Sequence, residues 1–174
     1  MGLKMGVPDY QSCMLPFLEA CSDQKEHSIK EIIDEVAKHF HLSNDDLSEM
    51  PPSGNQQVFN NRIGWARTYL KKAGLLDSST RGIFTITERG LSVLEQKPTK
   101  IDNNFLMQFP EFVRFQKPKS DNEANQPTIE VPDTALNPEE TIEKEYQSLK
   151  KELASEVLER LKEVDPYRFL ENCR

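Results

Sequence analysis

Residues 53–87 read SGNQQVFNNRIGWARTYLKKAGLLDSSTRGIFTIT, and this stretch decides the fold class. Small and apolar residues recur in it at steps of four and three, which predicts a helix over about 55–73 with one core face: Phe59, Ile63, Ala66, Leu70 and Ala73. Gly74 is a typical helix end. Two apolar runs, 75–76 and 83–86, flank the loop Ser78–Gly82 and predict a β-hairpin directly after the helix.

The predicted helix is basic, although the whole protein carries a formal charge of −7. Residues 1–120 hold 15 acidic and 15 basic residues, so the acidic excess lies in residues 121–163, which hold 12 acids and 5 bases. No carboxylate occurs between Ser53 and Leu76. A basic helix that leads into a hairpin is typical of a winged helix-turn-helix domain, in which one helix lies in a groove of DNA.

DNA offers phosphates and base edges, and the basic stretch offers side chains for both. Lysine and arginine neutralise phosphates, so we expect phosphate contacts from Arg62, Arg67, Lys71, Lys72 and Arg81. Amide and hydroxyl groups can meet base edges, so we expect base contacts from Gln57, Asn60, Asn61 and Thr68. Gly64 has no side chain and would let the backbone approach the nucleic acid. The alternative is a basic face that is only solvated, with Arg81 an exposed turn residue.

The aromatic residues nearby indicate packing. Trp65 and Tyr69 lie beside the core face of the predicted helix, where packing is commoner than base stacking. Residues 101–115, IDNNFLMQFPEFVRF, are dense in phenylalanine and are expected to form an arm that docks on the domain.

The remaining elements are predicted from their caps. Pro8-Asp9 is expected to open a first helix that Pro16 could kink. Ser28 with Glu31 forms a capping box for a second helix. A short helical piece follows at 43–50, and Thr87 is expected to cap a helix that runs to Lys97.

The C-terminal third predicts a linker and a long helix. Residues 117–128, KPKSDNEANQPT, have little to bury, whereas Asn137-Pro138 is a strong helix start. An apolar stripe extends to about residue 164: Ile142, Tyr146, Leu149, Leu153, Val157, Leu161 and Val164. We therefore divide the chain into a winged-helix domain (1–97), a docking arm (98–117), a flexible linker (118–136) and a connector helix (137–174). The fold class is mainly α with a small β-hairpin.

Other functions find little support in the sequence. The three cysteines and three histidines lack the spacing of a zinc site, and a cytoplasmic, reduced protein is the plain reading. No apolar run approaches the roughly 18 residues that span a membrane. Asp9, Asp23 and Lys25 spell a PD…DxK nuclease pattern, but they lie at a helix start and in a turn rather than on adjacent strands, so we interpret the match as chance. No catalytic residues are predicted.

Several segments together resemble the N-terminal half of Mrr-type restriction endonucleases. They are VPDYQSCMLPFLEACSDQKEHSIKEIIDEVAKHFHLS, PSGNQQVFNNRIGWARTYLKKAGLL, RGIFTITERG and IDNNFLMQFPEF, and the stretch NPEETIEKEYQSLKKELASEVLERLKEVDPYRFLE is similar to the connector in the same proteins. The resemblance covers the chain from about Val7, with the segments in the same order and spacing.

The resemblance implies a DNA-binding module of an enzyme that acts on modified, typically methylated, DNA. In that family a Mg²⁺-dependent PD-(D/E)xK nuclease domain follows the connector, so the resemblance implies that this chain alone does not cleave double-stranded DNA. An alternative of another class is a protein-interaction module, with a homodimer formed through the helix 138–164, or a stand-alone transcription regulator.

Overall fold

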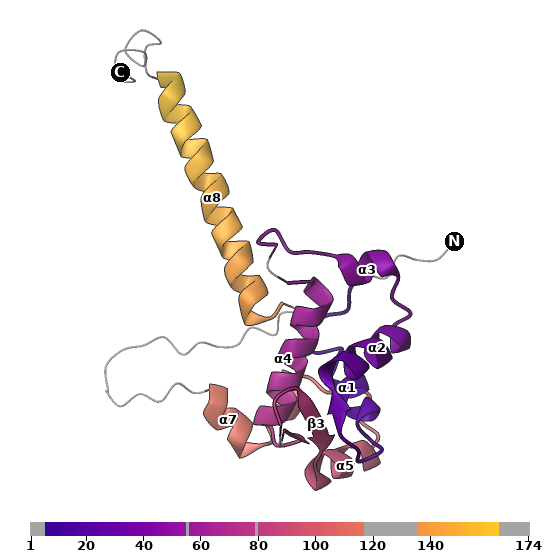
Figure 1. Ribbon diagram of the computed structural model, residues 1–174. Coiled ribbons are helices and arrows are strands. Elements are labelled where there is room, and N and C mark those ends of the chain that lie inside the picture. Colours follow the sequence, from indigo (N-terminus) through magenta and orange to yellow (C-terminus); the bar gives the residue numbers. More distant parts are fainter. Residues whose placement is uncertain (1–5, 55, 79, 117–135, 164–174) are drawn as a thin grey trace. The chain divides into compact units, whose positions relative to one another are not determined.

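The computed structural model describes residues 6–54, 56–78, 80–116 and 136–163, and the chain divides into two compact units, residues 1–137 and 138–174 (Figure 1). The described residues are mainly helical, with a small antiparallel sheet and a long C-terminal helix, which confirms the predicted fold class. In chain order the elements are α1 (Met14–Ala20), β1 (His27–Ser28), α2 (Ile29–His39), α3 (Asn44–Ser48), α4 (Val58–Lys72), β2 (Leu76–Asp77), β3 (Ile83–Ile86), α5 (Glu88–Glu95), α6 (Asn103–Leu106), α7 (Pro110–Gln116) and α8 (Pro138–Glu163).

The first helix begins later than the sequence indicated. Residues 10–13 form a turn, in which the Asp9 Oδ1 atom accepts hydrogen bonds from the backbone N–H groups of Gln11 (2.9 Å) and Ser12 (3.1 Å). α1 itself starts at Met14, so Pro16 stands in the first helical turn. Proline is compatible with that position because a first-turn N–H has no partner inside the helix.

Two of the predicted caps are present, at α2 and α5, and α3 has a capping box that the sequence analysis did not predict. The Ser28 hydroxyl accepts a hydrogen bond from the Glu31 N–H group, and the Glu31 carboxylate accepts one from the Ser28 N–H group, which completes the capping box of α2. Ser43 and Asp46 form a second box at α3. The Thr87 hydroxyl caps α5 by accepting from the Gly90 N–H group at 3.1 Å. These local signals fix where the helices start.

The sheet has one strand more than the predicted hairpin, and its order is β1-β3-β2. β2 pairs with β3 through Leu76↔Ile86. The strand β2 starts at Leu76, one residue later than the predicted start at residue 75. β1 pairs with the other edge of β3 through His27↔Phe84 and Ser28↔Ile83. A strand of two residues is too short to show an alternation of apolar and polar residues in the sequence. Only its pairing with β3 in the structure reveals it.

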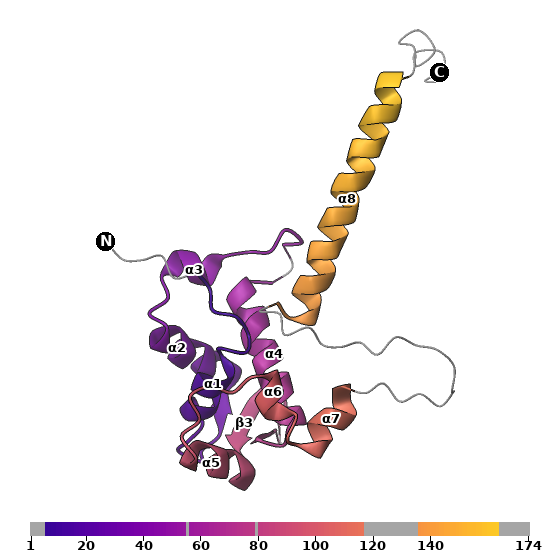
Figure 2. The same ribbon diagram turned by 180° about the vertical axis from the view of Figure 1, so that it is seen from behind.

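One core unites the helices of the first unit. Phe17 and Leu18 of α1 and Ile32 of α2 are fully buried together with the inward face of α4. Ile101 and Phe112 of the arm join the same core, and the view from behind shows α6 and α7 beside α4 (Figure 2). The phenylalanine-rich arm therefore completes the domain rather than standing apart from it.

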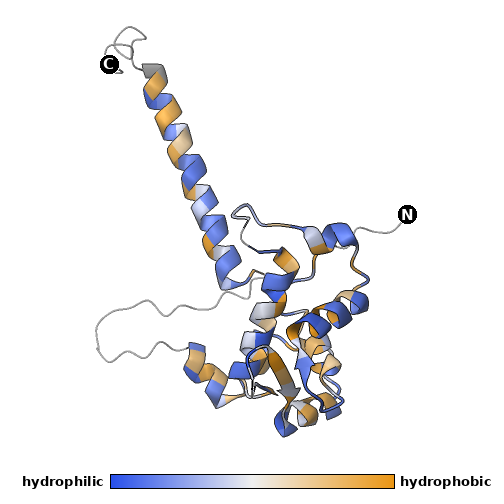
Figure 3. Ribbon diagram, viewed as in Figure 1, coloured by the Kyte–Doolittle hydropathy of each residue, from blue (hydrophilic) through white to orange (hydrophobic). Residues whose placement is uncertain are grey.

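The second unit consists of α8 among the described residues. Hydrophobic and hydrophilic residues alternate along it (Figure 3), and its apolar side chains are exposed, from 44% at Leu161 to 70% at Ile142. Most of the predicted linker (residues 118–135) and the end of the connector (residues 164–174) lie outside the described residues. Within the described ranges no helix is long and apolar enough to cross a membrane.

Candidate nucleic-acid interface

Helix α4 presents a core face that matches the sequence prediction. Five residues on it are completely buried: Phe59, Ile63, Ala66, Leu70 and Ala73. Gly74 follows the helix with φ +74°, a left-handed conformation that glycine adopts without strain. The helix is thus anchored along its whole length, and its other faces are held in fixed orientations.

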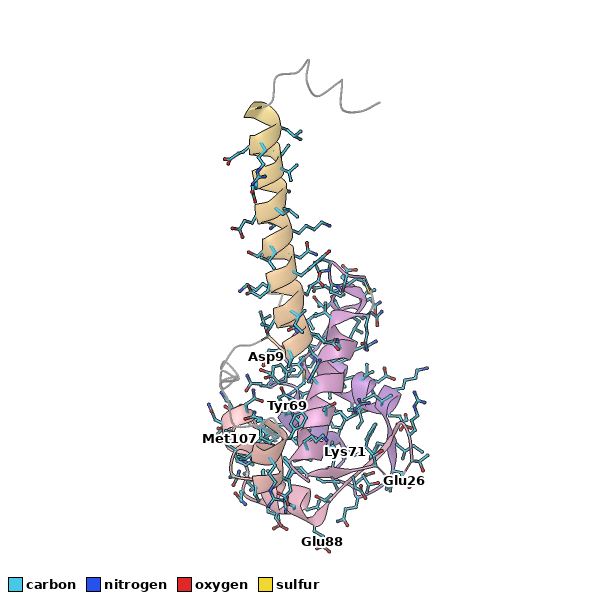
Figure 4. All side chains as sticks on the ribbon, turned by 90° about the vertical axis from the view of Figure 1, so that its left-hand side faces the viewer. Asp9, Glu26, Tyr69, Lys71, Glu88 and Met107 are labelled. Atoms are coloured by element: carbon cyan, nitrogen blue, oxygen red, sulfur yellow. The ribbon has the colours of Figure 1, made fainter. Side chains whose placement is uncertain are left out.

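A second face of α4 is covered by aromatic residues. Tyr69 is 3% exposed, and its ring makes edge contacts with Tyr10, Trp65 and Phe112 at centroid distances of 5.4, 5.7 and 5.4 Å. Figure 4 shows Tyr69 and Lys71 as neighbours on this helix. We call this covered side the aromatic flank; the turn before α1 and the arm helix α7 cover it. Trp65 and Tyr69 pack there, as the sequence indicated.

Arg62 faces the same flank and is engaged in the fold. Its Nη1 atom donates hydrogen bonds to the backbone carbonyls of Val7 (2.6 Å) and Pro8 (3.1 Å). The guanidinium therefore holds the N-terminal segment against α4. A phosphate contact from Arg62 stays a prediction, but its position gives it a structural role that the sequence did not indicate.

The remaining side of α4 is open, and we call it the open face: Asn60, Gly64, Arg67, Thr68 and Lys71. These positions are spaced by three and four residues, so they share one surface of the helix. Lys71 is exposed, and the other four are partly exposed. The Asn60 amide donates to the Gln57 Oε1 atom at 2.6 Å, which joins two of the predicted base-edge residues at the start of the helix.

Two further predicted residues lie between the open face and the aromatic flank. The Asn61 Oδ1 atom accepts a hydrogen bond from the Asn137 amide at 2.8 Å. The Lys72 Nζ atom lies 5.1 Å from the centre of the Phe115 ring, a cation–π contact that leaves the ammonium at the surface. Asn61 is partly exposed, whereas Lys72 is exposed like Lys71.

The hairpin places Arg81 close to the sheet rather than on a long extended loop. The loop Ser78–Gly82, which we call the wing, ends at Gly82 with φ +83°, and the Ile29 N–H group donates to the Gly82 carbonyl at 3.2 Å. Arg81 is exposed on the wing. Arg67 of the open face lies 5.6 Å from the Phe84 ring of β3. The sheet thereby links the open face to the base of the wing.

The residues of the nuclease-like pattern do not form a catalytic set. Asp9 caps the turn before α1, whereas Asp23 accepts a hydrogen bond from the His27 ring at 2.6 Å. Hydrogen bonds from the His27 side chain and the Lys25 backbone hold the pKa of Asp23 below its usual range. Among the described residues no group of three or more His, Cys, Asp or Glu side chains could hold a metal ion.

The buried thiols and the carboxylate in one surface hollow also have structural explanations. Burial raises the pKa of Cys13 and of Cys21 to about 12, so neither thiol ionises near neutral pH. A hollow beside α1 is lined in part by Asp102. Burial acts to raise the pKa of Asp102, but the ion pair with Lys100 (2.8 Å) and the Phe105 N–H group outweigh it and lower that pKa. This carboxylate serves to cap α6.

Comparisons with known proteins point to one family. Residues 10–96 match the Mrr N-terminal domain. The chain is also 30% identical, over 174 residues, to the type IV methyl-directed restriction enzyme EcoKMrr of Escherichia coli (strain K12); the match covers 95% of this chain and 56% of that protein. The chain thus spans about half the length of this relative. No solved structure matches.

The family match includes the elements from α1 to α5 and the entire sheet, and therefore both the open face of α4 and the wing. The EcoKMrr similarity extends this relationship over nearly the whole chain. The chain belongs to the Mrr N-terminal domain family.

Proposed function

We propose that this chain is a DNA-binding module of a restriction enzyme that acts on methylated DNA. The observation that carries the proposal is the open face of α4, where Arg67 and Lys71 lie beside polar side chains and next to a wing that bears Arg81. The core and the aromatic flank cover much of the rest of the helix, so among the described residues this face is the broadest surface of α4 that a groove of DNA could meet.

The residues divide into two groups by chemistry. Arg67, Lys71 and Arg81 neutralise phosphates, because lysine and arginine side chains at the surface displace counterions from DNA. Gln57 and Asn60 meet base edges near the helix start, and Thr68 does so in the second half of the helix. Asn61 and Lys72 contribute at the margin of this surface. Arg62 supports this surface indirectly, because it holds the N-terminal segment against α4.

A further part of the proposal concerns enzymatic activity. The relative EcoKMrr is a methyl-directed restriction enzyme, and we propose that this chain supplies recognition to a Mg²⁺-dependent nuclease domain, in the cytoplasm, without cleaving DNA alone. Incubation of the chain with plasmid DNA and Mg²⁺ should leave the plasmid supercoiled. Nicked or linear products that persist through repurification would contradict this.

The binding proposal is tested by fluorescence anisotropy with a labelled, randomised duplex of about 20 base pairs across a salt series. Lys71→Ala should weaken binding to every sequence and reduce the magnitude of the salt slope by about 0.9, the loss of one phosphate contact. Lys38→Ala is the matched control, because Lys38 is an exposed lysine on α2 that pairs with Glu35. Equal effects of the two substitutions would mean that the open face has no special role.

A second function is favoured by α8. Its stripe exposes Ile142, Leu149 and Leu153 at 70%, 64% and 62%, and exposed apolar stripes of this kind mark protein-binding surfaces. We propose that α8 also binds a protein partner. If that partner is a second copy of this chain, the result is a homodimer. Light scattering across a concentration series should show a mass increase that Leu149→Glu with Leu153→Glu abolishes. A constant monomer mass would exclude the homodimer.

A further inference from the structure

The apolar side chains of α8 have the spacing of a helix that pairs with another helix. Steps of four, three and four residues separate the first four of them: Ile142, Tyr146, Leu149 and Leu153. Such alternating steps define the contact line of a coiled coil. A further step of four leads to Val157 and locally unwinds the supercoil. We call these five residues the seam; all are exposed, from 47% at Val157 to 70% at Ile142.

The two sides of the seam differ in charge. One side is acidic, because steps of seven, four, three and four residues keep five glutamates on it: Glu145, Glu152, Glu156, Glu159 and Glu163. The other side carries Lys150, seven residues after Glu143. Beyond Val157 the ion pair of Arg160 with Glu156 (2.6 Å) interrupts the apolar surface, so the seam ends there.

A second copy of α8 complements this surface in one orientation. Glu145 precedes the seam residue Tyr146, and Lys150 follows the seam residue Leu149; both charged side chains are exposed. In a parallel pair of helices, a residue in the position of Glu145 lies beside the residue five positions later in the partner helix, which is Lys150 of the second copy. In an antiparallel pair the two acidic sides would face each other, and like charges would repel.

We propose that α8 pairs in parallel with α8 of a second copy of this chain, through the seam and through the contact of Glu145 with Lys150 of that copy. The inference rests on the proposed protein-binding function of α8 and names its partner and their orientation. Because the first unit precedes α8 in each chain, a parallel pair joins two copies of that unit to the same end. Both can then bind one duplex, which raises the effective affinity for DNA.

The charge contact is tested by sedimentation equilibrium of the full chain across a concentration series. Glu145→Lys and Lys150→Glu should each raise the dissociation constant of the pair by roughly tenfold, because two surface ion pairs become two like-charge contacts. The two substitutions combined should restore the pair. Lys151→Glu is the matched control, since it makes the same change of charge at an exposed lysine away from the seam and should leave the association unchanged. Circular dichroism verifies that each variant folds.

The orientation is tested by a disulfide near the start of the seam. Ile142→Cys combined with Cys173→Ser introduces one new thiol, while Cys13 and Cys21 are buried and stay unreactive. In a parallel pair the two new thiols are neighbours, so oxidation should give a covalent dimer. In an antiparallel pair the 15 residues from Ile142 to Val157 would separate them by roughly 20 Å, and no cross-link should form.

The possible failures are distinguishable. A monomer mass at every concentration would overturn the inference and the homodimer, whereas DNA binding of the same chain is measured separately by anisotropy. Association that Leu149→Glu with Leu153→Glu abolishes, but that gives no cross-link at Ile142→Cys, would keep α8 as a protein-binding surface and overturn the parallel orientation. If the combined exchange of Glu145 and Lys150 fails to restore the pair, the proposed charge contact is wrong.

Discussion

At the scale of the residue, Arg62 has a different role in the structure from the one that the sequence predicts. The sequence predicts a phosphate contact, whereas in the structure the guanidinium binds the backbone of the N-terminal segment. Its two carbonyl acceptors, on Val7 and Pro8, lie more than 50 positions away along the chain, so no local pattern reveals them. Arg62→Met should destabilise the protein by about 1–3 kcal/mol, because part-buried carbonyls lose their donor. It should leave the salt slope of DNA binding unchanged. Denaturant unfolding and anisotropy measure the two effects; an unchanged stability with a smaller slope would restore Arg62 as a phosphate contact.

The two helical glycines should respond in opposite directions to alanine. Gly64→Ala should raise the free energy of unfolding by about 0.5–1 kcal/mol, since the added methyl meets no neighbour and alanine favours the helix. Gly90→Ala should lower it by about 1–3 kcal/mol, because its Cβ atom would lie 2.4 Å from the Leu75 carbonyl oxygen and 2.6 Å from Ile86 Cγ1. Urea denaturation of both variants measures the contrast. A loss of stability in both would mean that the open face is packed more tightly than described.

At the scale of the element, the start of α2 should make stability depend on pH. Hydrogen bonds from the Ser28 backbone and hydroxyl lower the pKa of Glu31. A carboxylate with a lowered pKa stabilises the fold above its unfolded pKa of about 4.3, and this contribution is lost as the pH falls through the lower folded value. The melting temperature of Glu31→Gln should therefore lie below that of the unaltered chain at pH 7, and the gap should close towards pH 3. A constant gap would contradict the assignment.

The elements also show which parts of the fold a sequence can predict. The capping boxes of α2 and α3 and the core face of α4 depend on residues three or four apart, so they are predictable from local patterns. β1 has two residues and exists only through its pairing with β3, so local patterns miss it. For the same reason the sequence analysis expected the arm to dock but did not indicate that the N-terminal segment is held against α4 by Arg62.

At the scale of the whole molecule, the arm is expected to support the domain. Phe112 of α7 is fully buried against Tyr69, whereas its neighbour Phe115 is 40% exposed. Phe112→Ala should therefore cost about 3–5 kcal/mol of stability, and Phe115→Ala considerably less. Thermal unfolding of the two variants measures the difference. Equal, small losses would mean that residues 1–97 are stable without the arm.

The edge contact of Trp65 with Tyr69 has an optical consequence. The chain contains one tryptophan, so all of its tryptophan emission originates at a single point on the aromatic flank of α4, 5.7 Å from the Tyr69 ring. Excitation energy absorbed by that tyrosine passes to the indole more efficiently at this short distance than in the unfolded chain. The single indole is thus an intrinsic fluorophore. Its emission wavelength reports unfolding of the aromatic flank, and a change in its emission on addition of a duplex would test DNA binding without an attached dye.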